Sequence, residues 1–396
     1  MSDKIIVSGI GCCLVDLLYN GIDFSSETIQ PFLSKRRGDG GLIPGQLVFQ
    51  EEFETYCGIP LDIVLNKIKG TRPHDKINIG GPSIVSLIHL AQLADMDNCE
   101  VRFYGRGGKD EIGDYLLSSL KKTPVVLKDY KLIGNRTPST IVLSDPTYDN
   151  GHGERAFLNS IGAAWDYTPE EIDEDFFNSD IVVFGGTALV PRIHDSLTSL
   201  LKKAKSKGGI TVVNTVFDFR NEKANPTENW PLGESDESYS YIDLLVTDME
   251  EALRLSGKHD LNSAINFFME KKVSSLIITN GSKNISTYSD GRFFSSVGVN
   301  EMPVSRKIIE ELKSSKGGGD TTGCGDNFVG GVIASVVDQL QRSSLGLELE
   351  ETCSWGIVSG SFTCFYMGGT YFEERKGEKK ARIRPYYESY RNQISG

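Results

Sequence analysis

The sequence predicts an α/β fold in which a mostly parallel β-sheet is covered by helices on both faces. Short runs rich in valine and isoleucine, bounded by glycine, aspartate or asparagine, alternate with longer amphipathic segments through most of the chain. Alternation of strands and helices is typical of a parallel sheet buried on both sides. Ligands of such sheets bind at the carboxyl ends of the strands, in the loops that lead into helices.

The periodicity assigns the elements in chain order. The expected strands are residues 5–9, 101–104, 181–184, 211–213, 244–246 and 276–279. The expected helices are residues 83–94, 112–121, 193–207, 249–255, 261–271 and 325–340.

Two regions interrupt the alternation. Residues 17–78 hold no clean strand–helix unit, and residues 126–160 show strand patterns instead of helical ones. Strands that lie far apart in the sequence can pair into a small separate sheet, and a sheet hinged over the ligand edge serves as a lid. We therefore expect one domain over residues 1–396, with a lid and inserts drawn from 17–78 and 126–160.

Composition narrows the class of protein. Hydrophobic residues make up 39% of the 396 residues and charged residues 24%, which is typical of a globular protein and excludes bulk disorder. Glycine is in excess, with 42 residues, and no collagen-like period accompanies it. The excess predicts turns and loops where the backbone approaches a ligand closely.

The net charge of −12 argues against nucleic acid and against anionic membrane surfaces as partners. One basic cluster near the end is interrupted by glutamates and predicts a solvated surface segment. Its members are Arg375, Lys376, Lys379, Lys380, Arg382 and Arg384. No apolar stretch is long enough to span a membrane, and an odd number of cysteines without C-x-x-C favours reduced thiols in the cytoplasm.

A glycine-rich segment at residues 317–328 carries the strongest chemical signal. It runs into a helical pattern and places Gly323 and Gly325 at the start of that helix, where backbone N–H groups form an anion site. Asp326 lies in the first helical turn, as a proton acceptor beside a bound anion or as a capping group. On the residues alone the two interpretations are about equal.

At this point the sequence resembles a known family. Residues 320–326, Asp-Thr-Thr-Gly-Cys-Gly-Asp, look like the D-T-x-G-A-G-D signature of the PfkB/ribokinase carbohydrate kinases. Other segments resemble family motifs in the same order: Gly11 and Asp16 after the first strand, Gly80-Gly81 before a helix, Gly105 to Gly113 around Asp110, Asp248 to Glu251, and Thr279 to Ser282. The resemblance implies a ribokinase-like three-layer α/β/α fold with a mostly parallel central sheet and a small β-sheet lid.

The resemblance also implies an activity, the ATP-dependent phosphorylation of a hydroxyl group on a sugar or nucleoside. Asp326 would be the general base, and backbone N–H groups of Gly323, Cys324, Gly325 and Asp326 would form the anion hole for the transferred phosphoryl group. Asp248 and Glu251, on one face of a helix, would hold Mg²⁺ through water.

The remaining site residues follow from the same resemblance. Asp16, Gly80 and Gly81 would contact the substrate, and Thr279, Gly281 and Thr322 would contact the nucleotide. Arg106 and Arg155 are candidates for contacts with phosphates or an acidic substrate, although a solvated charge is the simpler interpretation. A monovalent cation and a homodimer stay open.

The sequence departs from the family pattern at several positions. Val85 stands where the family often has an asparagine that binds the sugar, which puts ordinary ribose or fructose recognition in doubt. Cys324 replaces a small alanine, and we expect it to act as a small apolar residue.

Three other functions stay open beside a sugar kinase. The first is a nucleoside kinase of the same family. The second is a ligand-binding protein without catalysis on this scaffold. The third is a dinucleotide-dependent oxidoreductase, suggested by Gly9-x-Gly11, although the third glycine of that fingerprint is missing.

Overall fold

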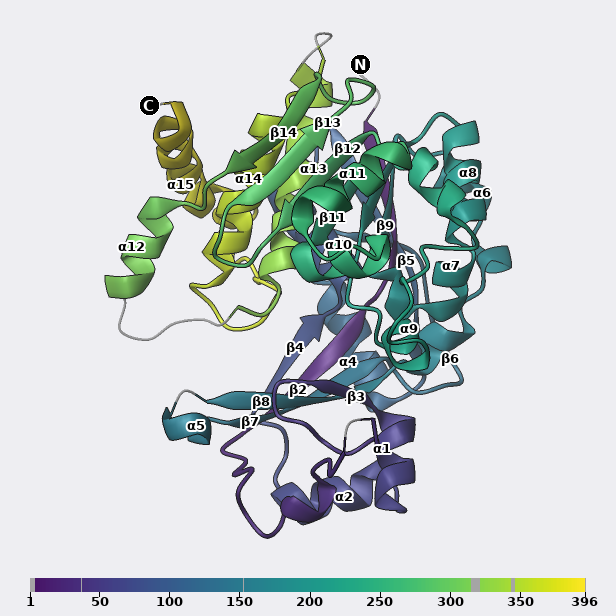
Figure 1. Ribbon diagram of the computed structural model, residues 1–396, viewed down its shortest axis with the longest axis vertical. Coiled ribbons are helices and arrows are strands. Elements are labelled where there is room, and N and C mark those ends of the chain that lie inside the picture. Colours follow the sequence, from purple (N-terminus) through teal and green to yellow (C-terminus); the bar gives the residue numbers. More distant parts are fainter. Residues whose placement is uncertain (1–3, 37, 152, 315–320, 343–345, 396) are drawn as a thin grey trace.

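A large twisted sheet with helices on both faces forms the upper body of the molecule, and a smaller sheet lies below it (Figure 1). The computed structural model describes residues 4–36, 38–151, 153–314, 321–342 and 346–395. All seven cysteines lie among the described residues, and none of them forms a disulfide bond. None of the described helices is both long and apolar enough to cross a membrane.

Nine strands form the large sheet, and the middle of that sheet is parallel. Their order across the sheet is β14 (Val297–Met302), β13 (Ile285–Ser289), β12 (Ser275–Thr279), β11 (Leu244–Asp248), β10 (Ile210–Asn214), β9 (Ile181–Gly185), β1 (Ile5–Gly11), β5 (Cys99–Gly108) and β6 (Val126–Ile133). Only the pairs β12–β13 and β13–β14 are antiparallel among these described strands. The parallel pairs bring the carboxyl ends of seven strands, from β12 to β6, to one edge, which faces the small sheet.

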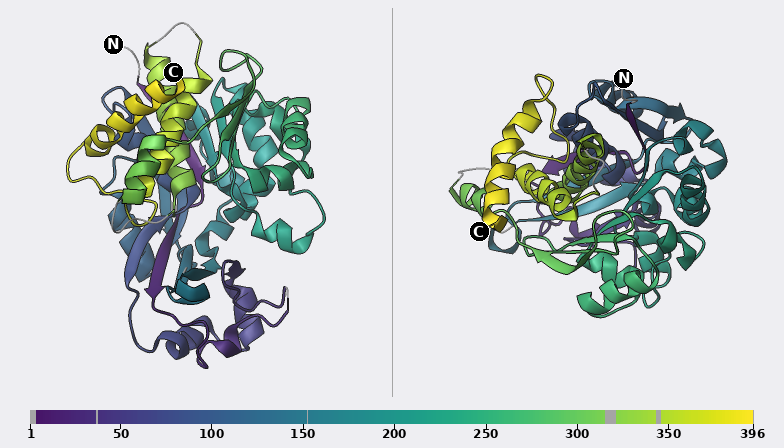
Figure 2. Two further views of the ribbon diagram at one scale, coloured as in Figure 1. Left: turned by 60° about the vertical axis from the view of Figure 1, so that its left-hand side comes forward. Right: turned by 90° about the horizontal axis from the view of Figure 1, so that it is seen from above.

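Side chains alternate between two cores, one on each face of the large sheet. In β9, Val183 joins the first core, whereas Val182 and Phe184 join the second, as the two-residue period of a strand requires. The first core lies under α3 (Pro82–Leu93), α4 (Glu111–Leu120), α12 (Arg306–Ser314), α13 (Cys324–Arg342), α14 (Leu349–Thr363) and α15 (Glu378–Ser395). The second lies under α6 (Glu174–Phe177), α7 (Pro191–Asp195), α8 (Leu197–Ser206), α10 (Met249–Ser256) and α11 (Leu261–Glu270). The expected three-layer α/β/α architecture is confirmed, as Figure 2 shows from above.

The small sheet is the lid that the sequence predicts. Its strand order is β3 (Leu47–Phe49), β8 (Glu154–Ser160), β7 (Ser139–Asp145), β2 (Leu14–Asn20) and β4 (Lys76–Gly80). Helices α1 (Gln50–Cys57) and α2 (Leu61–Lys69) pack on its outer face through Phe53 and Val64, while α5 (Tyr148–Gly151) joins β7 to β8. The region 17–78 therefore contains two α-helices, the strand β3 and parts of β2 and β4, which its periodicity did not reveal.

One strand lies elsewhere than expected. Residues Val126–Ile133 form β6, the edge strand of the large sheet, and they pair parallel with β5 rather than joining the lid. The reason is the connection: helix α4 lies between β5 and β6, and a strand–helix–strand unit places its second strand parallel beside the first. Of the region 126–160, only β7 and β8 enter the lid.

Candidate active site

Two helices begin at the carboxyl end of β1, and their N-termini frame the site. Helix α3 follows Gly81, which has a φ of 104°. A Cβ atom on Gly81 would lie 2.6 Å from the Cys12 carbonyl oxygen, so no side chain fits at this position. Helix α13 follows Gly323 and packs along α3, because a Cβ on Gly330 would reach within 2.5 Å of the Ser86 carbonyl oxygen. Both positive helix ends therefore point to the edge that the lid covers.

The turn before α13 has the geometry of an anion site. Gly323 has a φ of 76°, and a Cβ there would lie 2.3 Å from the Cα of Gly369. The first intrahelical hydrogen bond runs from the Asn327 N–H to the Gly323 carbonyl oxygen at 2.9 Å. The N–H groups of Gly325 and Asp326 precede that bond, so helix geometry leaves them directed out of the helix end. Residues 317–320 of the predicted segment lie outside the described residues.

Asp326 is a partly buried carboxylic acid in the first turn of α13. Burial raises the pKa of its carboxyl group to about 6. A carboxylate with a pKa near neutrality takes up a proton more readily than an ordinary aspartate, which suits a general base.

Asp326 and Asp16 lie close to the same buried thiol. Burial raises the pKa of Cys12, the neighbouring Cys13 adds to the rise, and the carboxylates of Asp326 and Asp16 raise it further. Gly80 is also adjacent, because a Cβ on it would lie 2.3 Å from Asp16 Oδ2. The structure thus brings Asp16, Gly80, Gly81 and Asp326 together around Cys12.

A polar row crosses the lid sheet at the level of Asp16. Asp16 pairs with Asn78 on β4 and with Thr140 on β7, and Thr140 pairs in turn with Asn159 on β8. Residues paired across neighbouring strands share a face, so these side chains point the same way. Asn159 Nδ2 donates to Thr140 Oγ1 at 3.0 Å, and its buried Oδ1 accepts no hydrogen bond from any described residue.

This face of the lid looks toward the large sheet. A Cβ on Gly368, in the loop after α14, would lie 2.5 Å from Asn78 Nδ2. From the sequence, only Asp16 of the row was identified. Asn78, Thr140 and Asn159 were missed because they are linked by strand register, which the sequence of a single strand does not show.

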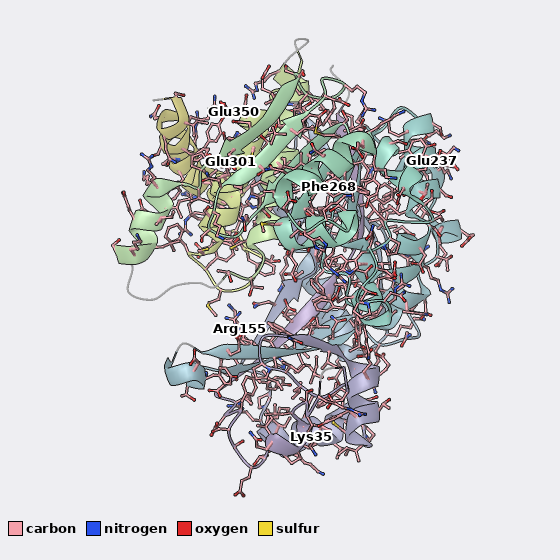
Figure 3. The ribbon with its side chains drawn as sticks, viewed as in Figure 1. Lys35, Arg155, Glu237, Phe268, Glu301 and Glu350 are labelled. Atoms are coloured by element: carbon pink, nitrogen blue, oxygen red, sulfur yellow. The ribbon has the colours of Figure 1, made fainter. Side chains whose placement is uncertain are left out.

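Arg155 links the lid to the signature turn. It lies on β8, on the side of the lid that faces the upper body (Figure 3), and its Nη1 donates to Thr322 Oγ1 at 3.4 Å. Arg106 has a different role. Its guanidinium is buried, pairs with Asp129 at 3.1 Å and Glu171 at 3.2 Å, and stacks on Tyr167, so it stabilises the fold and is neither a solvated charge nor a phosphate ligand.

Asp248 and Glu251 form a reciprocal capping box at the start of α10. Asp248 Oδ1 accepts the Glu251 N–H at 2.8 Å, and Glu251 Oε2 accepts the Asp248 N–H at 3.5 Å. Burial raises the pKa of Glu251 to about 8, with the charge of Asp248 adding to it. Thr215 and Thr247 donate to the same Glu251 oxygen.

The donor set at Asp248 and Glu251 fits a magnesium ion. Among the described residues, no group of three or more histidine, cysteine or acidic side chains is positioned for a metal. Magnesium is commonly held by one or two carboxylates plus water and phosphate oxygens, so two carboxylates at a strand end suffice. A buried carboxylate with a raised pKa gains most from a nearby cation.

Thr279 lies beside Asp248, since the last residues of β12 and β11 pair in register. Gly281 follows in the turn to β13, and a Cβ on it would meet nothing within 4 Å. The two predicted nucleotide contacts therefore lie in an open turn next to the capping box. Thr322 lies on the signature turn, next to Gly323.

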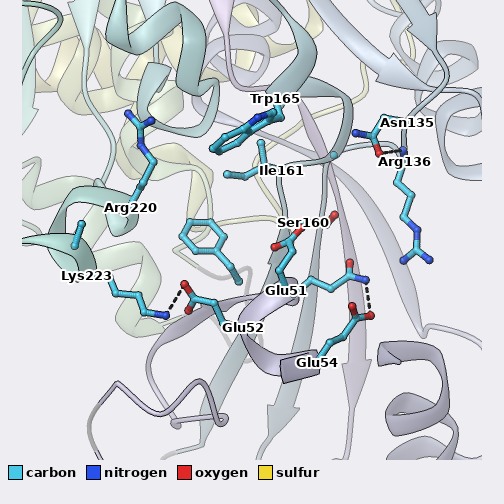
Figure 4. Close-up of a pocket in the computed structure, with 14 residues that line it drawn as sticks. Glu51, Glu52, Glu54, Asn135, Arg136, Ser160, Ile161, Trp165, Arg220 and Lys223 are labelled. Carbon is cyan, nitrogen blue, oxygen red and sulfur yellow. Dashed lines mark hydrogen bonds and ion pairs between the residues drawn. The ribbon is translucent and has the colours of Figure 1, made fainter. Parts of the chain in front are cut away.

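A cavity of about 830 Å³ opens between the lid insert and the upper body. Figure 4 shows Trp165 and Ile161 on one side and Glu51 and Glu52 of α1 on the other. The Lys223 Nζ–Glu52 Oε1 ion pair crosses from α9 (Phe219–Ala224) to α1 at 2.5 Å. Phe49 of β3, which pairs with Asn159 in register, also lines the cavity, so the cavity continues from the β3 end of the polar row.

Two departures from the family pattern have a structural setting. Val85 is 1% exposed and packs 3.3 Å from the position of a Cβ on Gly369, so it belongs to the core and offers no polar contact to a ligand. Cys324 lies in the first turn of α13 with its sulfur 3.5 Å from that of Cys364. The polar groups near Asp16 therefore come from the polar row of the lid and not from Val85.

The large sheet, the lid and the two helix N-termini define a ribokinase-like α/β fold. The family model described as "pfkB family carbohydrate kinase" matches residues 62–376, so the chain belongs to that family. This membership favours the kinase expectation over the dinucleotide-oxidoreductase alternative.

Individual relatives agree on the fold. A fructokinase of Solanum tuberosum is 26% identical over 265 residues, which are 66% of this chain and 73% of that protein. An adenosine kinase from Sinorhizobium meliloti superposes with a TM-score of 0.69 at 18% identity, covering 96% of this chain and 99% of the other. An Arabidopsis thaliana ribokinase, solved with ribose and ATP, gives a TM-score of 0.58 at 16% identity, covering 91% and 92%.

Proposed function

We propose that the protein is an ATP-dependent kinase that phosphorylates a hydroxyl group of a sugar, with Asp326 as general base and an anion hole at residues 323–326. The observation that carries the proposal is the position of Asp326. Its carboxyl group, with a pKa of about 6, lies beside helix N–H groups that precede the first intrahelical hydrogen bond, and it faces the same buried thiol, Cys12, as the substrate candidate Asp16.

The reaction follows from these positions. Asp326 takes the proton of the acceptor hydroxyl as the new oxygen–phosphorus bond forms and the bond between the γ-phosphorus and the β–γ bridging oxygen breaks, releasing ADP. The N–H groups of Gly325 and Asp326 donate to the oxygens of the transferring phosphoryl group, where negative charge gathers. A positioned base contributes roughly 10²–10⁴ in rate.

The polar row supports a polyol acceptor. Asp16, Asn78, Thr140 and Asn159 offer several hydrogen-bonding groups along one line, which matches a molecule with hydroxyl groups on successive carbons. The unpartnered Oδ1 of Asn159 is an acceptor for a ligand hydroxyl, since buried polar atoms are normally satisfied. The fructokinase relative favours a sugar.

The nucleotide side rests on Thr279, Gly281 and Thr322, with Arg155 close to Thr322. Asp248 and Glu251 would hold Mg²⁺, which supplies positive charge to the phosphate oxygens when bound. With a net charge of −12, the protein as a whole offers ATP no attraction, so local positive groups must do so.

A nucleoside acceptor is the second candidate. Trp165 and Phe49 line the 830 Å³ cavity that continues from the polar row, and aromatic rings stack on a planar base. The adenosine kinase from Sinorhizobium meliloti shares the fold over nearly the whole chain. Replacing Trp165 by alanine separates the two candidates, because only a nucleoside acceptor loses stacking.

The test is an ADP-release screen with ATP and Mg²⁺ over sugars, sugar acids and nucleosides. We expect turnover with at least one sugar and none in Asp326→Asn, which keeps the shape of the side chain but cannot take up the proton. Turnover on no acceptor would favour a ligand-binding protein without catalysis. Undiminished turnover in the variant would remove Asp326 from the role of base.

A further inference from the structure

The C-terminal helix α15 carries a lysine that is buried against the signature turn. Lys379 is 1% exposed, although the sequence predicted its basic segment to be solvated, and it is the exception in a cluster whose other members are not buried. It lies just beyond the family match, which ends at residue 376. Burial lowers its pKa well below the usual value, and the charge of Glu373 partly opposes that shift.

The amine of Lys379 donates a hydrogen bond to Asn327, the residue that follows Asp326. Its Nζ lies 2.8 Å from Oδ1 of Asn327, which is 0% exposed. The rings of Tyr366 and Tyr371 flank the amine at 5.4 and 5.6 Å. Tyr366 donates its hydroxyl to the same oxygen at 3.2 Å.

Asn327 connects this amine to the anion hole. Its Nδ2 donates to the carbonyl oxygens of Gly323 and Gly369, both at 2.8 Å. Carbonyl oxygens only accept, so the NH₂ end must face them and Oδ1 must face Lys379. In that orientation Nζ is the donor whether the amine is charged or neutral.

The consequence concerns the geometry of the turn. Gly323 and Gly369 are in close contact, and the Asn327 amide ties their two carbonyl groups together. If the amide rotated, its oxygen would face both carbonyls and the Gly323 peptide would have to turn away. The N–H groups that follow Gly323 would then move from the place where the phosphoryl group is transferred.

We propose that Lys379 is a positioning residue for phosphoryl transfer, which holds the anion hole in shape through Asn327. The proposal rests on the proposed kinase function. A buried amine is costly, and an apolar side chain of similar length is often neutral or better for stability. Methionine at this position should therefore give a fold that is at least as stable. What lysine contributes is the orientation of the Asn327 amide.

The experiment compares Lys379→Met, Asn327→Ala and the double variant with the wild type in the ADP-release assay. The matched control is Arg384→Met, which removes an exposed positive charge from the same helix. We expect Lys379→Met to lower kcat about 10- to 100-fold. Removing one donor of an oxyanion hole typically lowers kcat about 10²- to 10³-fold, and misaligned N–H donors should lose part of that effect. The KM values for ATP and acceptor should stay within about twofold. The reason is that the contact between the anion-hole N–H groups and the transferring phosphoryl group is strengthened only in the transition state.

Two further readouts separate positioning from a structural role. The melting temperature of Lys379→Met should equal or exceed that of the wild type, and the double variant should lose no more kcat than Asn327→Ala alone. An unchanged kcat in Lys379→Met, a failure of that variant to fold, or multiplicative losses in the double variant would each overturn the proposal. A wild type that phosphorylates no acceptor would instead overturn the proposed kinase function itself.

Discussion

Asp16 of the lid and Asp326 of helix α13 both raise the pKa of the same buried thiol, that of Cys12. The two residues are 310 positions apart in the chain, and strand β1 brings them together because it ends at this point and continues into the lid. In the proposed kinase reaction, Asp16 would bind the acceptor hydroxyl and Asp326 would take up its proton. Four expectations follow for variants and conditions that change this arrangement.

Activity should fall in acid as Asp326 takes up a proton. Burial raises the pKa of this carboxyl group to about 6, and a general base must be deprotonated to work. We expect kcat/KM to fall about tenfold per pH unit below pH 6 and to level off above it. Initial rates from pH 5 to 8, in buffers of constant ionic strength, measure the profile, and a level profile down to pH 5 would contradict this pKa.

Replacing Asp326 by asparagine should stabilise the protein at neutral pH while it removes activity. Because the pKa of Asp326 is raised from 3.8 to about 6 in the folded state, ionisation of this residue disfavours folding. Its contribution to the free energy of unfolding is therefore fully present below pH 4 and is lost as the pH rises through 6. Two pKa units correspond to about 3 kcal/mol, and partial exposure reduces this to about 1–2 kcal/mol at pH 7.5.

Urea unfolding of Asp326→Asn and wild type at pH 7.5 and pH 4.5 measures this difference. The stability gain should be present at the higher pH and should shrink at the lower one. A variant that is less stable than the wild type at pH 7.5 would show that the carboxylate is favourably bound in the folded state.

Replacing Asp16 by asparagine should weaken acceptor binding without affecting the nucleotide. Hydrogen bonds to a charged group are worth about 1.5–3 kcal/mol, so the KM for the acceptor should rise roughly 10- to 100-fold while the KM for ATP stays constant. Glu27→Gln, an exposed charge change on the lid, is the control. Equal changes in both KM values would mean that the variant disturbs the lid as a whole.

Replacing Glu251 by glutamine should raise the magnesium requirement. The glutamine keeps the shape and accepts the hydrogen bonds of Thr215 and Thr247, but it carries no charge for a cation. We expect the Mg²⁺ concentration for half-maximal rate to rise about 10- to 100-fold, as for other losses of metal-site groups. Glu250→Gln, exposed on the same helical turn, should leave the Mg²⁺ curve unchanged, and a matching shift in that variant would point to a general charge effect.

The sequence predicted the layers of the fold and the turn that holds Asp326, because both depend on local signals. Valine- and isoleucine-rich runs mark the buried strands, and the segment 320–326 is unusual enough to be identified by itself. The position of Val126–Ile133 was predicted wrongly, since a strand pattern does not say which sheet the strand joins. The chain connection through α4 decides it.

The partners of Asp16 and Asp326 could not be predicted in the same way. Thr140 and Asn159 join Asp16 through the register of β2, β7 and β8, and register is a property of the folded sheet. Lys379 lies in a segment of alternating charges, and only the packing of α15 against Tyr366 and Tyr371 shows that it is buried. Charge patterns average over a helix, whereas burial is decided residue by residue.

The passage from β1 to β2 has a mechanical consequence. Only Cys12 and Cys13 separate the two strands, and Gly80 and Gly81, which join the lid back to α3, touch the same point. This point can serve as a hinge for the lid, and the residues that would bind the acceptor lie next to it. Helices α1 and α2 lie at the opposite, outer edge of the lid (Figure 1). If the lid rotates about this point, a small rotation would move the outer edge of the lid much further than Asp16. The opening through which molecules enter and leave would then widen while the proposed contact between Asp16 and the acceptor is kept.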